Sequence, residues 1–196
     1  MFLHVGLGNP GNLYKNHRHN IGFMAIDKLL EFYNISEKKN KFNGIYAKIN
    51  KGNGTSIFFK PLTFMNNSGQ PVSEIINYFS VPKSSVFVWH DEIDLEIGKV
   101  RIKTSGGHGG HNGVKDITKH IGDKYNRIRI GIGRPPKFIN PADWVLSSFN
   151  DQELNNSWLT NLLKIMVKES YKIEDNDFTG FMNKIPLINN NQGKEK

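Results

Sequence analysis

The chain has 196 residues, of which 37% are hydrophobic and 13 are phenylalanine, so it is long enough to bury a hydrophobic core in one domain. It contains no cysteine, which excludes disulfide bridges and cysteine nucleophiles and leaves His, Asp and Glu as the available metal ligands. The N-terminal residues lack the pattern of a signal peptide, and no stretch approaches the roughly 18 consecutive apolar residues of a membrane span. We therefore expect a cytoplasmic protein without a membrane partner.

The formal net charge of +8 comes from one segment, residues 99–137. This segment contains ten Lys and Arg residues and two acidic residues, whereas the rest of the chain contains 16 of each kind. A basic excess concentrated in one segment indicates a polyanionic partner, most simply a nucleic acid. The alternative is a solvated basic surface without a partner.

The first apolar run, Phe2 to Leu7, ends in a Gly-Asn-Pro-Gly turn and predicts a buried strand. Residues 6–11 also match the pattern G-x-G-x-x-G of dinucleotide-binding folds. That function requires a helix at the turn and an acidic residue closing a second strand about 20 residues later. Because loop-like residues continue as far as His19, the pattern does not favour a dinucleotide site.

Helical and strand patterns alternate through the rest of the chain, which predicts a single α/β domain, a twisted mixed β-sheet surrounded by helices. We expect the domain to cover residues 1–188 and the polar residues 189–196 to form a disordered tail. The predicted elements are a helix from Asn20 to about Tyr33, a loop over 34–43, a hairpin of strands 45–49 and 55–59, a helix after Gly69, a buried strand over 86–89, and one long helix from about Asn150 with Glu153 in capping-box position.

Two strands of the basic segment, Lys99 to Lys103 and Arg127 to Ile132, alternate charged and apolar residues, so each should present one basic and one buried face. Between them lies a glycine-rich loop, Ser105 to Gly113, followed by a short helical pattern. Glycine allows close backbone approach to a ligand, and a helix N-terminus favours anions. The loop therefore predicts an anion-binding site. Its His108 and His111 could alternatively be metal ligands or ordinary loop side chains.

Histidine is the best candidate for acid–base chemistry, since its ordinary pKa lies near neutrality. His4 lies within a predicted strand and is better explained as a core residue. His19 lies between a loop and a helix, and Asp91, at the end of the apolar strand, is its natural orienting partner; the alternative is a structural Asp91. Asparagine amides in the loops suit gripping of peptide groups or stabilisation of an oxyanion, although capping and turn formation explain the same residues, which are Asn9, Asn20, Asn66 and Asn112.

The sequence resembles the bacterial-type peptidyl-tRNA hydrolases over about residues 3–149. The motifs that carry the resemblance are Gly-Leu-Gly-Asn-Pro-Gly (6–11), Tyr14, Arg-His-Asn (18–20), Thr-Phe-Met-Asn (63–66), Ser-Gly (68–69), His-Asp (90–91), Asp-Leu (94–95), Gly-Gly-His-Gly-Gly-His-Asn-Gly (106–113) and Arg-Ile-Arg-Ile-Gly-Ile-Gly-Arg-Pro (127–135). Two positions depart from the family pattern: His17 replaces a common Thr and Glu96 replaces a usual Pro. Neither departure removes a proposed catalytic group.

The resemblance implies a monomeric, cytoplasmic esterase without a metal or cofactor, which hydrolyses the ester between a peptide and the 3′-terminal ribose of tRNA and so recycles tRNA from stalled translation. His19 would activate water, Asp91 would orient His19, and Asn9 would polarise the attacked carbonyl. Lys103 and Arg129 would clamp the tRNA 5′-phosphate. The implied substrate-binding residues are Tyr14, Asn20, Phe64, Met65, Asn66, Gly109, His111 and Asn112.

Two other functions are compatible with parts of the sequence. A non-catalytic RNA-binding module would explain the basic strands, but such modules usually interleave aromatic residues with the basic ones, and here Val and Ile occupy those positions. A metal-dependent hydrolase would use His108, His111 and a carboxylate.

Overall fold

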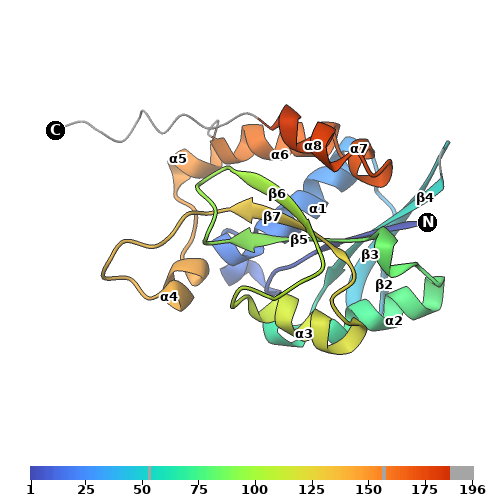
Figure 1. Cartoon of the computed structure of the whole chain (residues 1–196), viewed down its shortest axis with the longest axis horizontal. Coiled ribbons are helices and arrows are strands. Elements are labelled where there is room, and N and C mark those ends of the chain that lie inside the picture. Colours follow the sequence, from blue (N-terminus) through green and yellow to red (C-terminus); the bar gives the residue numbers. More distant parts are fainter. Residues whose placement is uncertain (53, 156–157, 186–196) are drawn as a thin grey trace.

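A twisted seven-stranded β-sheet runs through the centre of the computed structural model, which describes residues 1–52, 54–155 and 158–185 (Figure 1). The strands lie in the order β2-β3-β4-β1-β5-β7-β6. Their bounds are β1 Phe2–Gly6, β2 Lys39–Lys41, β3 Gly44–Lys51, β4 Gly54–Pro61, β5 Val86–Glu92, β6 Val100–Thr104 and β7 Asn126–Gly131.

The four central strands of the sheet are parallel. β1 pairs with β4 and with β5, and β5 pairs with β7, while β2, β3 and β6 are added in antiparallel pairs. The carboxyl ends of β1, β4, β5 and β7 therefore share one edge of the sheet. Ligand sites of α/β proteins lie beyond this edge, because the loops that follow the strands converge there.

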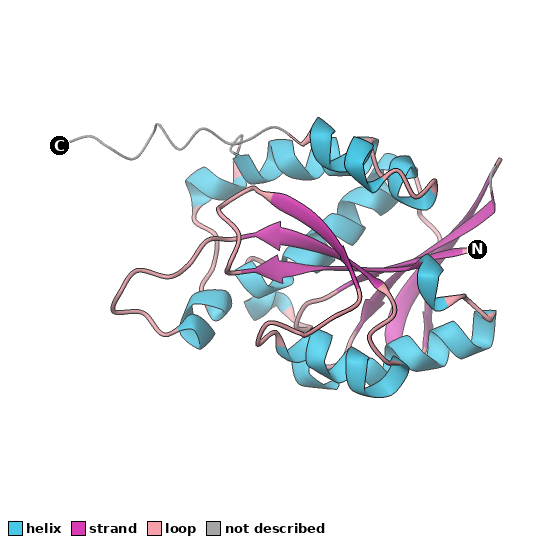
Figure 2. Ribbon diagram, in the orientation of Figure 1, coloured by secondary structure: helices cyan, strands magenta, loops and turns pink. Residues whose placement is uncertain are grey.

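Helices cover both faces of the sheet (Figure 2). α1 and the C-terminal helices lie over one face and enclose a core around Trp89, whereas α2 and α3 lie over the other and enclose a core around Val88. The helix bounds are α1 Ile21–Phe32, α2 Gly69–Phe79, α3 Asn112–Ile121, α4 Pro141–Leu146, α5 Asp151–Leu154, α6 Trp158–Lys168, α7 Tyr171–Glu174 and α8 Phe178–Lys184. No helix within the described residues is long and apolar enough to cross a membrane.

The predicted fold class is confirmed, and so are the first helix, the hairpin of β3 and β4, and the helix predicted after Gly69, which begins at Gly69 itself. These elements depend on residues close together in the chain, so the local sequence pattern was sufficient to predict them. The capping box at the start of α5 is also confirmed, since Asn150 Oδ1 accepts from Glu153 N at 2.8 Å and Glu153 Oε2 accepts from Asn150 N at 2.9 Å.

Four local predictions were wrong. Residues 34–43 are not entirely a loop, because 39–41 form the edge strand β2. The apolar strand continues to Glu92, so Asp91 lies within β5 rather than after it. The single helix predicted from Asn150 is two helices, α5 and α6, because the backbone is extended at Asn155. Arg127 is 2% exposed and does not contribute to a basic surface. The predicted tail, 189–196, lies outside the described residues.

Candidate active site

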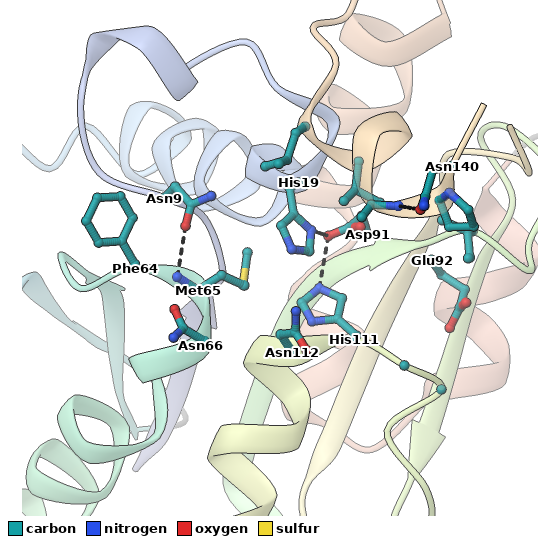
Figure 3. Close-up of a pocket in the computed structure, with 17 residues that line it drawn as sticks. Asn9, His19, Phe64, Met65, Asn66, Asp91, Glu92, His111, Asn112 and Asn140 are labelled. Carbon is teal, nitrogen blue, oxygen red and sulfur yellow. Dashed lines mark hydrogen bonds and ion pairs between the residues drawn. The ribbon is translucent and has the colours of Figure 1, made fainter.

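A pocket of about 740 Å³ opens at the carboxyl edge of the sheet (Figure 3). The loop after β1, the segment after β4, the end of β5 and the start of α3 all contribute to it, as the parallel strand arrangement predicts. Segment 140–146 closes another side. The lining residues are Asn9, His19, Phe64, Met65, Asn66, Asp91, Glu92, Ile93, Gly109, Gly110, His111, Asn112, Asn140, Pro141, Ala142, Val145 and Leu146.

His19 and Asp91 meet in this pocket, as predicted. His19 lies in the short 3-10 helix Arg18–Asn20 before α1, and its Nδ1 lies 2.8 Å from Asp91 Oδ1. Because a carboxylate accepts hydrogen bonds, Nδ1 carries the proton and Nε2 remains an acceptor in the pocket. His19 is 7% exposed, so little solvent competes for Nε2.

The two groups adjust each other's pKa. Burial lowers the pKa of His19, but the negative charge of Asp91 and the hydrogen bond between them outweigh burial and raise it above 6.5. Burial alone would raise the pKa of the Asp91 carboxyl, yet the charges and hydrogen bonds of His19 and His111 hold it well below its usual range. Asp91 is thus an anion, and it stabilises the protonated form of His19.

His111 is a second partner of Asp91, which the sequence did not indicate. Its Nε2 lies 2.9 Å from the same oxygen, Asp91 Oδ1 (Figure 3). Its Nδ1 accepts from Val114 N at 3.3 Å and so caps the start of α3. Both ring nitrogens of His111 are therefore engaged, whereas His19 keeps one nitrogen for the pocket. Of the two imidazoles, only His19 is arranged to accept a proton from a substrate or water.

The side chains of His19, Asp91 and His111 could also hold a metal ion, because one ligand atom from each lies within 4.8 Å of the others. The hydrogen bonds around His111 fit this use badly. A metal at Nε2 requires the remaining ring proton on Nδ1, which would then face the N–H of Val114. His108, which the metal alternative paired with His111, is exposed, and within the described residues its side chain accepts a hydrogen bond only from Gly110 N, at 3.1 Å.

Asn9 presents an amide donor to the pocket. Its Oδ1 accepts from Met65 N at 2.8 Å, and this contact turns Nδ2 the other way, where no partner exists among the described residues. The backbone of Asn9 is held by the Asn20 side chain through two hydrogen bonds of 2.9 Å. Asn20 is therefore a buried support behind the pocket, and its predicted side-chain cap on α1 is absent.

Comparison with known proteins identifies the family to which the chain belongs. The sequence model of the family described as peptidyl-tRNA hydrolase matches residues 3–195. The chain belongs to the peptidyl-tRNA hydrolase family. It is therefore an enzyme, and the resemblance seen in the motifs is confirmed.

Individual relatives of this hydrolase cover most of the chain. A peptidyl-tRNA hydrolase of Dinoroseobacter shibae is 43% identical over 187 residues, which are 95% of this chain and 79% of the relative. One of Rickettsia prowazekii is 49% identical over 154 residues, which are 78% of this chain and 83% of the relative. The crystal structure of peptidyl-tRNA hydrolase from Acinetobacter baumannii has a TM-score of 0.85 and 35% identity, covering 94% of each chain.

Four asparagines line the hydrolase pocket: Asn9, Asn66 and Asn112 lie along one side, and Asn140 lies on another (Figure 3). Asn112 is the first residue of α3 and not its cap, because His111 has that role. Phe64, Met65 and Gly109 also line the pocket, as expected. Tyr14 does not line it. Its ring lies edge-on to Phe64, with centroids 6.1 Å apart, and so supports the pocket rim.

The apolar wall that α4 forms at the pocket was not predicted from the sequence. Ala142, Val145 and Leu146 of this helix line the pocket together with Ile93. Asn140 caps the helix by accepting from Ala142 N at 2.9 Å, and Pro141 is its first residue. An Asn-Pro pair is a recognised helix start, so this signal was present in the sequence.

The expected phosphate clamp of the hydrolase lies outside the pocket lining. Lys103 is exposed, whereas Arg129 is half-buried and its Nε donates to Glu92 Oε2 at 2.9 Å. Glu92 also lines the pocket, so it connects the two regions. In the antiparallel pair of β6 and β7, Arg129 lies opposite Arg101 and Lys103 opposite Arg127, which puts all four on one face of the sheet.

Charged side chains of the protein itself bind the backbone of Gly106 and Gly107, in the first half of the glycine loop. Arg127 donates to the carbonyl oxygens of Gly106 and Gly107, and Gly106 N donates to Asp123 Oδ2 at 2.9 Å. Asp123 thus takes the place that an external anion would need. The anion-binding hypothesis was wrong for this part of the loop, whose contacts keep it folded between the basic strands.

Proposed function

We propose that the chain hydrolyses the ester that joins a peptide, or an N-blocked amino acid, to the 3′-terminal ribose of tRNA. The observation that carries the proposal is the pairing of His19 Nδ1 with Asp91 at 2.8 Å, which leaves Nε2 free in a pocket that Asn9, Asn66 and Asn112 line along one side. Family membership supports the same substrate. The cytoplasmic location and the monomeric state stay predictions.

His19 acts as the general base. A water molecule between its Nε2 and the ester carbonyl loses a proton to Nε2 as its oxygen attacks the carbonyl carbon. The anionic Asp91 stabilises the resulting imidazolium. When the tetrahedral intermediate collapses, the imidazolium returns the proton to the ribose oxygen, and the peptide leaves as a carboxylic acid. The bond between the carbonyl carbon and the ribose oxygen is the one that breaks.

Asn9 stabilises the negative charge that develops on the carbonyl oxygen. Its Nδ2 is the free donor at the pocket, and the contact of Oδ1 with Met65 N keeps the amide in this orientation. A fixed donor of this kind needs no reorganisation during the reaction, and removal of one such donor typically costs about 10²–10³ in rate.

Asn66 and Asn112 hold the peptide and the 3′ end of the tRNA. An amide side chain both donates and accepts, so it binds main-chain groups of any peptide sequence without changing charge. The free α-amino group of an ordinary aminoacyl-tRNA would bring a positive charge to this pocket, whereas an amide would not. This difference accounts for a preference for N-blocked substrates.

Lys103 and Arg129 bind phosphate on the RNA side. Glu92 holds Arg129 through Nε, which leaves the terminal nitrogens of the guanidinium for a phosphate. Lys103→Ala should weaken tRNA binding and reduce the slope of log affinity against log salt by about 1. Lys168→Ala, a lysine of α6 on the other side of the sheet, is the matched control. An unchanged slope in Lys103→Ala would remove this residue from the clamp.

The decisive experiment compares hydrolysis of N-acetyl-aminoacyl-tRNA with that of the same aminoacyl-tRNA carrying a free amino group. We expect turnover of the first and little of the second. Equal hydrolysis of both would contradict the proposed specificity, and hydrolysis of neither would leave the RNA-binding module as the better description. Retained turnover after exhaustive chelation would exclude the metal-dependent alternative.

A further inference from the structure

The apolar pocket wall, α4, has no core of its own. None of the side chains of Pro141–Leu146 is buried, and a helix of six residues is not stable in isolation. In Figure 1 the helix lies beside the carboxyl edge of the sheet, at the end of a long connection from β7. Contacts from elsewhere in the chain must therefore hold this wall against the pocket. Trp144 and Val145 pack, partly buried, against the edge of the core around Trp89.

Arg18, the residue before His19, adds polar and stacking contacts. Its guanidinium carbon lies 4.1 Å from the ring centroid of Trp144 in α4 and 4.8 Å from that of Phe149. Its two terminal nitrogens donate to the two carboxylate oxygens of Glu153 at 2.9 and 3.0 Å. Its Nε donates to Ser147 Oγ at 3.3 Å. The side chain is only 7% exposed, so these contacts are shielded from water.

Backbone hydrogen bonds also connect the residues next to His19 with the segment after α4. Arg18 N donates to Ser147 O at 2.9 Å, and Phe149 N donates to Asn16 O at 2.8 Å. The residues before His19 thus pair with the segment that directly follows α4. At its other side, α4 is tied to the loop after β7 by Trp144 Nε1, which donates to Gly133 O at 2.9 Å.

We propose that Arg18 is a positioning residue that fixes the α4 wall relative to His19, so that the wall contacts the side chain of the ester-linked amino acid. The proposal rests on the proposed function. It also explains why the neighbour of the base is an arginine, since only a planar guanidinium stacks on two rings and bonds both oxygens of a carboxylate.

The effect of this wall should depend on the substrate. The asparagines of the opposite side, Asn9, Asn66 and Asn112, suit the peptide main chain. The wall residues Ala142, Val145 and Leu146 are left to face an amino-acid side chain. A leucyl side chain reaches such a wall, whereas a glycyl residue has nothing to place against it. Displacement of the wall should therefore reduce hydrolysis of the leucyl substrate more than that of the glycyl substrate.

The test uses Glu153→Gln and Arg18→Lys, with Glu174→Gln as the matched control. Glu174 is a buried carboxylate in contact with His4 and Lys51, away from the pocket, so its variant loses a comparable ion pair without touching α4. For each protein, kcat/KM is measured on N-acetyl-leucyl-tRNA and N-acetyl-glycyl-tRNA. Hydrogen–deuterium exchange of the amides of residues 142–147 is measured in parallel.

We expect the leucyl to glycyl ratio of kcat/KM to fall about fivefold in both test variants, within the range that one apolar contact contributes to specificity. The amides of α4 should exchange faster in these variants and not in Glu174→Gln. A uniform loss on both substrates, or unchanged exchange in α4, would overturn the positioning role. Failure of the unaltered protein to hydrolyse either substrate would instead overturn the proposed function.

Discussion

Within the described residues, histidine meets a buried carboxylate at two sites: Asp91 binds His19 and His111 at the pocket, and Glu174 binds His4 away from it. His19 Nδ1 lies 2.8 Å from Asp91, and His4 Nε2 lies 2.9 Å from Glu174. In the second pair the other ring nitrogen is also engaged, because Trp89 Nε1 donates to His4 Nδ1 at 3.2 Å. His4 is completely buried under the C-terminal helices.

The surroundings shift the pKa values of His4 and His19 in opposite directions. Burial lowers the pKa of His4, and the hydrogen bond and charge of Glu174 do not offset it; the nearby Lys51 lowers it further. Asp91 raises the pKa of His19 despite burial. A histidine beside a carboxylate is therefore no sign of catalysis by itself. Among the described residues, His19 is distinguished by a ring nitrogen that has no partner and faces a pocket, and by the lack of a nearby lysine that would lower its pKa.

The largest effect should follow removal of the proposed base. His19→Ala should reduce kcat by about 10³-fold or more, since general-base catalysis contributes about 10²–10⁴. Binding of tRNA should stay close to normal because the basic face is untouched. His4→Phe is the control, which replaces the other histidine with a core residue of similar shape and should retain turnover. Near-normal turnover in His19→Ala would contradict the base assignment.

The next effect concerns the orientation of His19. Asp91→Asn should reduce kcat by about 10²-fold, because the neutral amide stabilises the imidazolium poorly and does not fix the ring tautomer. The charge of Asp91 raises the pKa of His19, so its removal should move the acid limb of the pH–rate profile to lower pH. An acid limb that stays in place would show that another group controls this titration, with His17 the first alternative to examine.

A change in the pair of His4 and Glu174 should affect the stability of the protein and not its activity. Glu174→Gln should lower the free energy of unfolding by about 2 kcal/mol, because His4, Ser56 and Lys51 lose a charged partner. The pKa of Glu174 is lowered to about 2, since the partners that hydrogen-bond and attract its anion outweigh burial.

The pH dependence of this stabilisation follows from the depressed pKa. It is fully present above the ordinary value of 4.5 and is lost as the pH falls toward about 2. Urea unfolding between pH 7 and pH 3 should therefore show a steeper loss of stability in the unaltered protein than in Glu174→Gln. Parallel curves would mean that Glu174 contributes no such linkage.

The smallest effect is expected for His111, the second donor to Asp91. His111→Asn removes this hydrogen bond but keeps a side chain that can cap α3, so helix stability should change little. The loss of one donor to a buried anion should reduce kcat by about tenfold. A loss as large as that of His19→Ala would mean that His111 takes part in proton transfer.

Local structure was largely predictable because neighbouring residues determine it. The helical spacing after Asn20, the hairpin between β3 and β4, and the capping box of Asn150 and Glu153 each depend on residues a few positions apart. The errors had two causes. The edge strand β2 pairs with the neighbouring β3, but its exposed residues Lys-Asn-Lys carry no alternating apolar pattern that would predict a strand. Arg127 is buried because it bonds the glycine loop about 20 positions away, a contact that the local pattern of β7 does not contain.

By itself the sequence determined the fold class, the family motifs and the residue types available for chemistry. Only the tertiary structure decided that His111 shares the Asp91 oxygen, that Asn20 supports Asn9, and that Arg18 holds α4. The reason is physical: His19 and Asp91 are 72 positions apart, and the parallel pairing of β1 with β5 brings their chain segments together. Which ring nitrogen of His19 remains free at the pocket then depends on the side chains that the fold places around it, above all Asp91.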